Sequence, residues 1–237
     1  MSVLTSLGIL ILAVFACAFL QLVPGVFAVF YHYASAKNSR DKALNLSSFF
    51  VIGNAVMTTL LLALIYFSLY HFLLDNPMFD ITMLYWAIAG ILALLGLFVF
   101  CFYYRRGKGT ELFISRKAAK SILLKARTVR NSSDAFVLGL AAGIFEIIFV
   151  LPIYIVVVLE IIGSSVDNLL YAPILLFIFM FFTILPTFSV REQMYRRQKN
   201  LADIERSRVK YKMFYRIMLG TSYILLAAFI VSFRILG

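Results

Sequence analysis

Charged residues and the side chains of common active sites are scarce in this chain. Only 14% of its 237 residues are Asp, Glu, Lys or Arg, and it has two cysteines and two histidines, whereas soluble domains average about 25% charged residues. The sequence contains no CxxC pair, no Cys/His spacing typical of a metal site, and no Gly-rich phosphate loop, GxSxG or HExxH motif. We therefore expect neither an enzyme active site nor a bound metal or cofactor.

Apolar residues, in contrast, dominate the chain. They make up 63% of the sequence, and the mean hydropathy is +0.96. A helix of roughly 20 apolar residues spans the hydrocarbon core of a bilayer. Six runs reach that length, at about 3–34, 47–74, 81–104, 135–162, 169–190 and 213–236. They lack the alternation of membrane β-strands, so the sequence predicts an all-α polytopic membrane protein with six transmembrane helices.

The basic residues predict how these helices are oriented. Of the 22 Lys and Arg residues, 21 lie in the first, third and fifth connections, with the fifth counted through Arg216 at the start of the last span, and only Arg234 falls elsewhere. The second and fourth connections, "LDNPMFD" and "GSSVDN", carry acids and no bases. By the positive-inside rule, the odd connections are cytoplasmic and both termini lie outside. We expect a multi-pass protein of the cell inner (plasma) membrane whose basic loops contact anionic lipid of the cytoplasmic leaflet, not nucleic acid.

The two longest basic connections have helical patterns. The segment "ELFISRKAAKSILLKARTVR" alternates apolar and basic residues at roughly helical spacing, which predicts an amphipathic helix along the inner membrane surface. The later segment "REQMYRRQKNLADIERSRVKYK" carries both signs of charge and is typical of a solvated helical extension of the neighbouring spans.

The six spans divide into two halves of three. Residues 1–104 form the first half, 105–134 the basic linker, and 135–237 the second half. Because three is odd, a duplication would place the halves in opposite orientations, as an inverted repeat. Each half opens with a proline-containing span, "QLVPGVFAVF" and "FVLPIYIVVV". Paired helix breaks of this kind occur at the substrate sites of transporters, although a plain kink repaired by neighbouring side chains gives the same pattern.

Polar residues near these prolines complete the predicted site. Glu146 is the one acid at the centre of a predicted span, where ionisation costs at least about 2.5 kcal/mol, so a proton-carrying role is the functional hypothesis. The structural alternative is that Glu146 is a neutral carboxyl that only forms a hydrogen bond between helices. The amides of Gln21 and Asn54 could likewise bind solute or only form hydrogen bonds between helices. The predicted substrate-binding or coupling residues are Gln21, Pro24, Gly25, Asn54, Glu146, Pro152 and Tyr154.

Two longer stretches carry a family resemblance. They are "LVPGVFAVFYHYASAKNSRDKALNLSSFFVIGNAV" and "RTVRNSSDAFVLGLAAGIFEIIFVLPIY", and in them the chain resembles the LysE (lysine exporter) superfamily of small six-span exporters. Pro24 and Gly25 match the start of that family's Pro-Gly-Pro motif, and Pro152 matches the proline of its Asn-Pro-Lys motif. Val26, Leu151 and Ile153 depart from these motifs, so the resemblance implies a divergent member, with Glu146 supplying the polar function.

The expected function is therefore proton-coupled export of a small solute, such as an amino acid or cation, by alternating access. Besides the solute and lipid, a second copy of the chain is a candidate partner, which would make the protein a homo-oligomer. One alternative function is a non-transporting membrane scaffold that docks partners through its basic cytoplasmic loops. The other is a thiol carrier of the CcdA/DsbD type, which needs a cysteine beside the proline in each half. Cys17 lies seven residues before Pro24 and Cys101 ends the third span, so we expect both to be small buried apolar residues instead.

Overall fold

The computed structural model describes residues 3–20, 30, 40–102, 116–164, 171–196 and 201–235, and every regular element in these ranges is helical. The helices are α1 (Val3–Leu20), α3 (Arg40–Asp75), α4 (Ile81–Phe102), α5 (Arg116–Thr128), α6 (Ser132–Ser164), α7 (Tyr171–Arg196) and α8 (Leu201–Ile230), followed by a short π-helix, η1 (Val231–Ile235). The prediction of an all-α protein is confirmed.

Each predicted span corresponds to one of these helices, and the predicted linker helix corresponds to α5. Four of the helices, α3, α4, α6 and the last part of α8, are long and apolar enough to cross a membrane. In α1 and α7 the described apolar stretches are shorter, at Thr5–Cys17 and Ala172–Leu185. The chain therefore has the helices of a multi-pass membrane protein. Residues 21–29, with the predicted site residues Gln21, Pro24 and Gly25, lie outside the described residues.

Local sequence signals explain the hairpin between α3 and α4. Asn76 ends α3, because its backbone N–H and its side-chain amide both donate to the Phe72 carbonyl, at 3.1 and 3.0 Å, and Pro77 follows it. Asp80 caps α4 by accepting the Thr82 N–H at 2.9 Å. Hydrogen bonds from the Thr82 side chain and backbone lower the pKa of Asp80.

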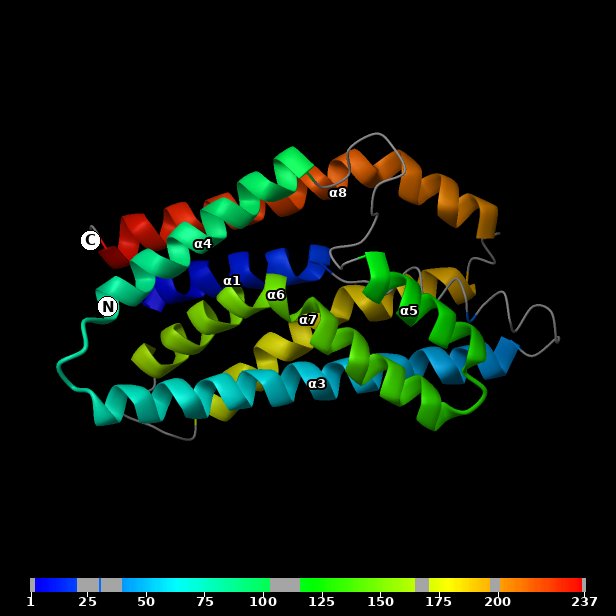
Figure 1. Ribbon diagram of the computed structural model, residues 1–237, viewed down its shortest axis with the longest axis horizontal. Coiled ribbons are helices and arrows are strands. Elements are labelled where there is room, and N and C mark those ends of the chain that lie inside the picture. Colours follow the sequence, from blue (N-terminus) through cyan, green and yellow to red (C-terminus); the bar gives the residue numbers. More distant parts are fainter. Residues whose placement is uncertain are drawn as a thin grey trace.

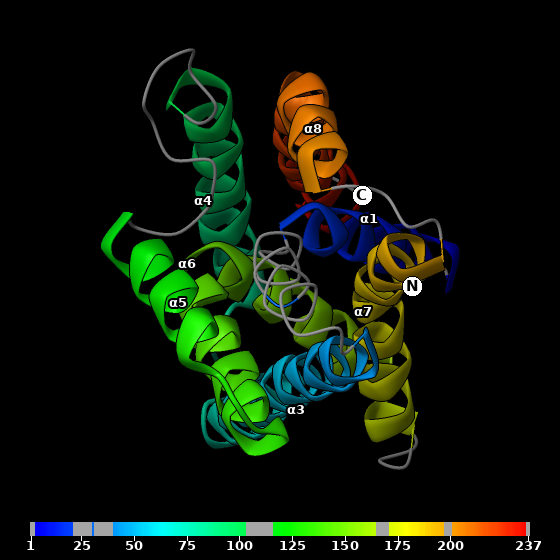
Figure 2. The same ribbon diagram turned by 90° about the vertical axis from the view of Figure 1, so that its right-hand side faces the viewer.

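Helix α6 lies at the centre of the bundle. It contacts α1, α3, α4, α5 and α7, with the most extensive contact along α3, while α4 lies along α8. Seen end-on, the other helices surround α6 (Figure 2). The first residues of α1, the start of α4, the end of α6 and η1 lie at one end of the molecule (Figure 1). We call this end the terminal end, and the end that carries α5 the basic end.

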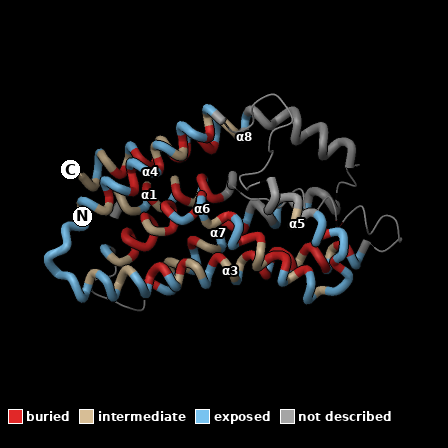
Figure 3. The backbone as a smooth tube through the Cα atoms, in the orientation of Figure 1, coloured by how far each residue is buried: buried red, intermediate tan, exposed pale blue. Residues whose placement is uncertain are grey.

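Two hydrophobic clusters fill the bundle between these ends. The larger one joins residues of α1, α3, α4, α6, α7 and α8. The smaller one, toward the basic end, includes Ile122 and Ala126 of α5 together with Phe50 of α3 and Leu138 of α6. Part of the apolar face of α5 is thus buried against protein. The exposed residues of α3 and α4 are largely apolar, among them Leu64 and Leu94 (Figure 3), as expected for a surface that faces lipid.

Glycines bring α3 and α6 into backbone contact. A Cβ atom at Gly53 would collide with the Phe136 carbonyl, and one at Gly139 would collide with the Phe50 carbonyl. Gly139 and Gly143 form a GxxxG pair, the pattern that allows close packing of membrane helices. This close approach fixes the polar side chains of α3 against the middle of α6.

Candidate functional site

Buried polar side chains gather where α1, α3 and α6 meet in the middle of the bundle. Asn54 and Thr58 lie one turn apart on α3, and Glu146 and Tyr154 lie on α6. All four are buried, with Asn54 only 6% exposed and Glu146 only 7% exposed. We call Asn54, Thr58, Glu146 and Tyr154, together with Cys17 of α1, the central polar cluster.

Electrostatic and hydrogen-bonding contacts connect the members of this cluster. Glu146 lies close enough to Cys17 and to Tyr154 to interact electrostatically with both. The side chains of Thr58 and Tyr154 share a hydrogen bond. The Tyr154 ring is held edge-on against Phe179 of α7, with ring centroids 6.2 Å apart. The carboxyl group that the sequence singles out therefore lies near two neutral polar groups, the thiol of Cys17 on α1 and the hydroxyl of Tyr154 on its own helix.

Asn54 retains an unused acceptor in this cluster. Its buried Oδ1 accepts no hydrogen bond from any part of the chain that the structure describes. The atom lies beside Gly143, where a Cβ atom would stand 3.0 Å from it. An unsatisfied buried acceptor costs free energy, so Asn54 offers a position at which a donor group of a water or solute would gain a hydrogen bond.

Pro152 lies between Glu146 and Tyr154 on α6, and α6 continues through it as a single helix. The proline has no N–H for the Ile148 carbonyl, and its ring presses on the carbonyls of that turn. The hydroxyl of Tyr223, a fully buried residue of α8, donates to the adjacent Phe149 carbonyl at 2.8 Å. A neighbouring helix thus supplies a hydrogen bond where the proline disturbs the backbone ladder.

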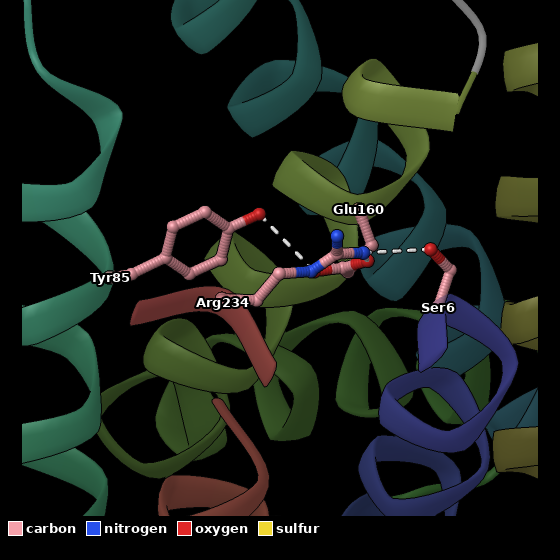
Figure 4. Close-up of polar contacts among 4 residues, drawn as sticks. All are labelled: Ser6, Tyr85, Glu160 and Arg234. Atoms are coloured by element: carbon pink, nitrogen blue, oxygen red, sulfur yellow. Dashed lines mark hydrogen bonds and ion pairs between the residues drawn. The ribbon is translucent and has the colours of Figure 1, made fainter. Parts of the chain in front are cut away.

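A second polar cluster lies at the terminal end, and the sequence analysis missed it. The Arg234 guanidinium of η1 forms a forked ion pair with Glu160 of α6: Nε donates to Oε1 at 2.7 Å and Nη2 contacts Oε2. Nη2 also donates to Ser6 Oγ of α1 at 2.8 Å, and the Tyr85 hydroxyl of α4 donates to Glu160 Oε1 at 3.2 Å. Four helical elements thus meet at one ion pair (Figure 4). We call Ser6, Tyr85, Glu160 and Arg234 the terminal-end cluster.

A signal for this cluster was present in the sequence. Arg234 is the one basic residue outside the odd connections, and Glu160 is an acid near the same predicted end of another span. Charges inside apolar segments pair with one another or mark functional sites. Because Glu160 and Arg234 both lie near the predicted outer side of the membrane, the sequence already indicated that they form an ion pair. Ser6 and Tyr85 gave no such signal, because hydroxyls near helix ends are common.

The structure also locates the remaining candidate residues. Cys17 is buried, as expected, but Cys101 is exposed, so the prediction of two buried cysteines is wrong for Cys101. It lies at the end of α4, a helix whose outward face carries exposed apolar residues such as Leu97 and Phe98. Between α7 and the first part of α3, Arg191 donates a hydrogen bond to Ser48 at 2.7 Å. No group of three metal-binding side chains occurs among the described residues.

The chain matches no protein-family model, no curated protein and no solved structure. Functional inference therefore depends on the two polar clusters and on the arrangement of the helices that carry them.

Proposed function

We propose that the protein is a transporter that exports a small solute across the inner membrane by alternating access, with Glu146 as the proton-carrying group. The observation that carries this proposal is the central polar cluster. A carboxyl side chain is buried in the middle of the most enclosed apolar helix, within one turn of the glycine that contacts an amide oxygen without a partner among the described residues. Such groups are costly in a membrane and are typical of solute and proton pathways.

The contacts between helices are compatible with an inverted repeat. Exchanging the halves pairs α1 with α6, α3 with α7, and α4 with α8. Under this exchange, the contact α3–α6 becomes α7–α1, and α1–α8 becomes α6–α4, while α1–α6, α3–α7 and α4–α8 map onto themselves. All seven of these pairs are in contact. A pseudo-two-fold arrangement supports alternating access, in which the halves rock about a site at their interface.

The distribution of charge supports the proposed orientation. The start of α3, helix α5 and the start of α6 lie at the basic end (Figure 1). There, Lys125 and Arg127 are exposed at the end of α5. We propose that this end is cytoplasmic and contacts anionic lipid headgroups, and that the terminal end faces outward. The proposed topology has six spans and both termini outside.

The resemblance to the LysE superfamily supports the choice of an exporter over a scaffold. Pro152 is buried in α6 within two turns of Glu146, and its neighbours differ from the Asn and Lys that the family carries there. Polar function in this half of the chain would then come from Glu146 and Tyr154. A proton carrier must expose its carboxyl to each side in turn.

Glu146→Gln tests this proposal, because the amide preserves shape and hydrogen bonding but carries no proton. We expect the variant to fold like the parent and to lose pH-gradient-driven flux in proteoliposomes, with L-lysine and monovalent cations as the first test solutes. Infrared difference spectra across the physiological pH range should show a titrating carboxyl band in the parent that the variant lacks. Gradient-driven flux through Glu146→Gln at the parent rate would exclude Glu146 as the coupling group.

A further inference from the structure

The terminal-end cluster has an internal division that follows the two halves of the chain. Its ion pair lies within the second half, because Glu160 is on α6 and Arg234 is on η1. Its two flanking hydrogen bonds reach into the first half. Arg234 donates to Ser6 of α1, and Tyr85 of α4 donates to Glu160. The charges thus hold one half together, while the two hydroxyls connect that half to the other (Figure 4).

The cluster is closed off from the surface at its core. The side chains of Arg234 and Glu160 are only 4% and 0% exposed, although the cluster lies near the end of the bundle. The cluster adjoins the larger hydrophobic cluster, to which Tyr85 and Ile161 belong. Hydrogen bonds to charged groups are stronger than those between neutral groups. The flanking hydroxyls therefore act as specific contacts between the halves at this end of the bundle.

We propose that the terminal-end cluster is the outer gate of the transporter. In the closed gate, Ser6 and Tyr85 hold the first half against the Glu160–Arg234 pair, and the central polar cluster has no path to the outside. The gate opens when α1 and α4 withdraw their hydroxyls, while the ion pair stays intact within the second half and leaves no lone charge. This inference rests on the proposed transport function and adds a location for the outer barrier.

The two flanking hydroxyls allow the gate to be weakened without disturbing the charges. Removing Glu160 or Arg234 leaves an unpaired buried charge, which is strongly destabilising. Ser6→Ala and Tyr85→Phe remove only the bonds between the halves and nearly conserve volume. Ser222→Ala and Tyr66→Phe are matched controls. Ser222 is a buried serine that donates to the Met218 carbonyl of its own helix at 2.7 Å, and Tyr66 is a buried tyrosine of α3 outside the cluster.

Cys17 serves as the reporter, because it is buried in the central polar cluster. In a Cys101→Ser background, it is the single thiol. A membrane-impermeant methanethiosulfonate reagent is added to right-side-out vesicles, and to inside-out vesicles in parallel. We expect outside labelling to be about threefold faster in each single variant and about eightfold faster in the double variant. These ratios correspond to interhelical hydrogen bonds of about 0.6 kcal/mol each. Labelling from the inside should not rise.

Two results would overturn the gate. One is an unchanged rate of outside labelling in the folded double variant, which would make the contacts merely structural. The other is an equal rise from both sides, which would indicate general loosening of the bundle. If the double variant does not fold, each single variant still gives its own ratio. Ser222→Ala and Tyr66→Phe should label at the parent rate from both sides, and a rise in either of them equal to that in the gate variants would also count against the proposal.

The labelling experiment tests the gate and the flux experiment tests the proton-carrying role of Glu146, so each proposal can fail without the other. One-sided acceleration together with normal flux through Glu146→Gln would retain the gate and remove the proton-carrying role of Glu146. Unchanged labelling together with proton-coupled flux through the parent would retain the transporter and place its outer barrier elsewhere.

Discussion

Replacing Tyr223 by phenylalanine removes one hydroxyl and almost no volume from the interior of the bundle. Tyr223 is fully buried, and its hydroxyl donates to the Phe149 carbonyl at 2.8 Å, within the turn that Pro152 disturbs. Without the hydroxyl, that carbonyl loses a donor where the backbone ladder is already incomplete. Interhelical hydrogen bonds in membranes average about 0.6 kcal/mol and reach about 1.7 kcal/mol. We expect Tyr223→Phe to cost an amount near the upper value, about 1.5 kcal/mol.

A double-mutant cycle separates this repair from ordinary packing. Pro152→Ala restores the N–H that bonds the Ile148 carbonyl and removes the ring that presses on the carbonyls of this turn, so the Phe149 carbonyl depends less on the Tyr223 hydroxyl. Equilibrium unfolding in mixed micelles should show that Tyr223→Phe costs about 1 kcal/mol less in the Pro152→Ala background than in the parent, which is a coupling typical of residues in contact. Tyr66→Phe, on α3, should cost the same in both backgrounds. If Tyr223→Phe also costs the same in both, within about 0.3 kcal/mol, the bond does not compensate for the proline.

Two further predictions concern packing and topology. In unfolding assays, Gly139→Ala should destabilise the fold by about 1–3 kcal/mol, because its Cβ would meet the Phe50 carbonyl. Gly90→Ala is the control: nothing lies within 4 Å of the added atom, so this variant should be neutral or gain up to about 1 kcal/mol of stability. Equal effects of the two substitutions would contradict the close α3–α6 contact. Reporter fusions after Lys42, Arg130 and Lys210 should report cytoplasm, and fusions at Asn76 and Asn168 the outside; a cytoplasmic signal at Asn168 would refute the inverted arrangement.

Hydropathy alone located the helices, because a bilayer imposes both apolarity and length on each span. The run 81–104 became α4 (Ile81–Phe102), and 135–162 became α6 (Ser132–Ser164). The run 47–74 missed the first turns of α3, which begins at Arg40. Hydropathy marks where a helix meets lipid, and the helical backbone continues beyond that point into polar sequence.

The candidate site was only partly predictable for a different reason. Asn54, Glu146 and Tyr154 were identifiable as polar residues in predicted spans, and the structure buries all three. That Cys17 lies beside Glu146, or that Tyr223 reaches the Phe149 carbonyl, depends on which helices are neighbours and how each is rotated. Those relations follow from packing details, such as the glycines between α3 and α6, that a single sequence does not display as a pattern.

The Glu160–Arg234 pair also has a consequence for biogenesis, because its members are 74 residues apart in the chain. Membrane helices are inserted in the order in which they are synthesised, so α6 reaches the bilayer before α7, α8 and η1 exist. During that interval Glu160 has no guanidinium partner, and an ionised carboxylate within the hydrocarbon is costly. We expect α6 to remain near the interface until η1 arrives. In pulse-labelled chains, protease resistance of α6 should then appear only after Arg234 has been synthesised, and resistance in chains that end before α8 would argue against this order of assembly.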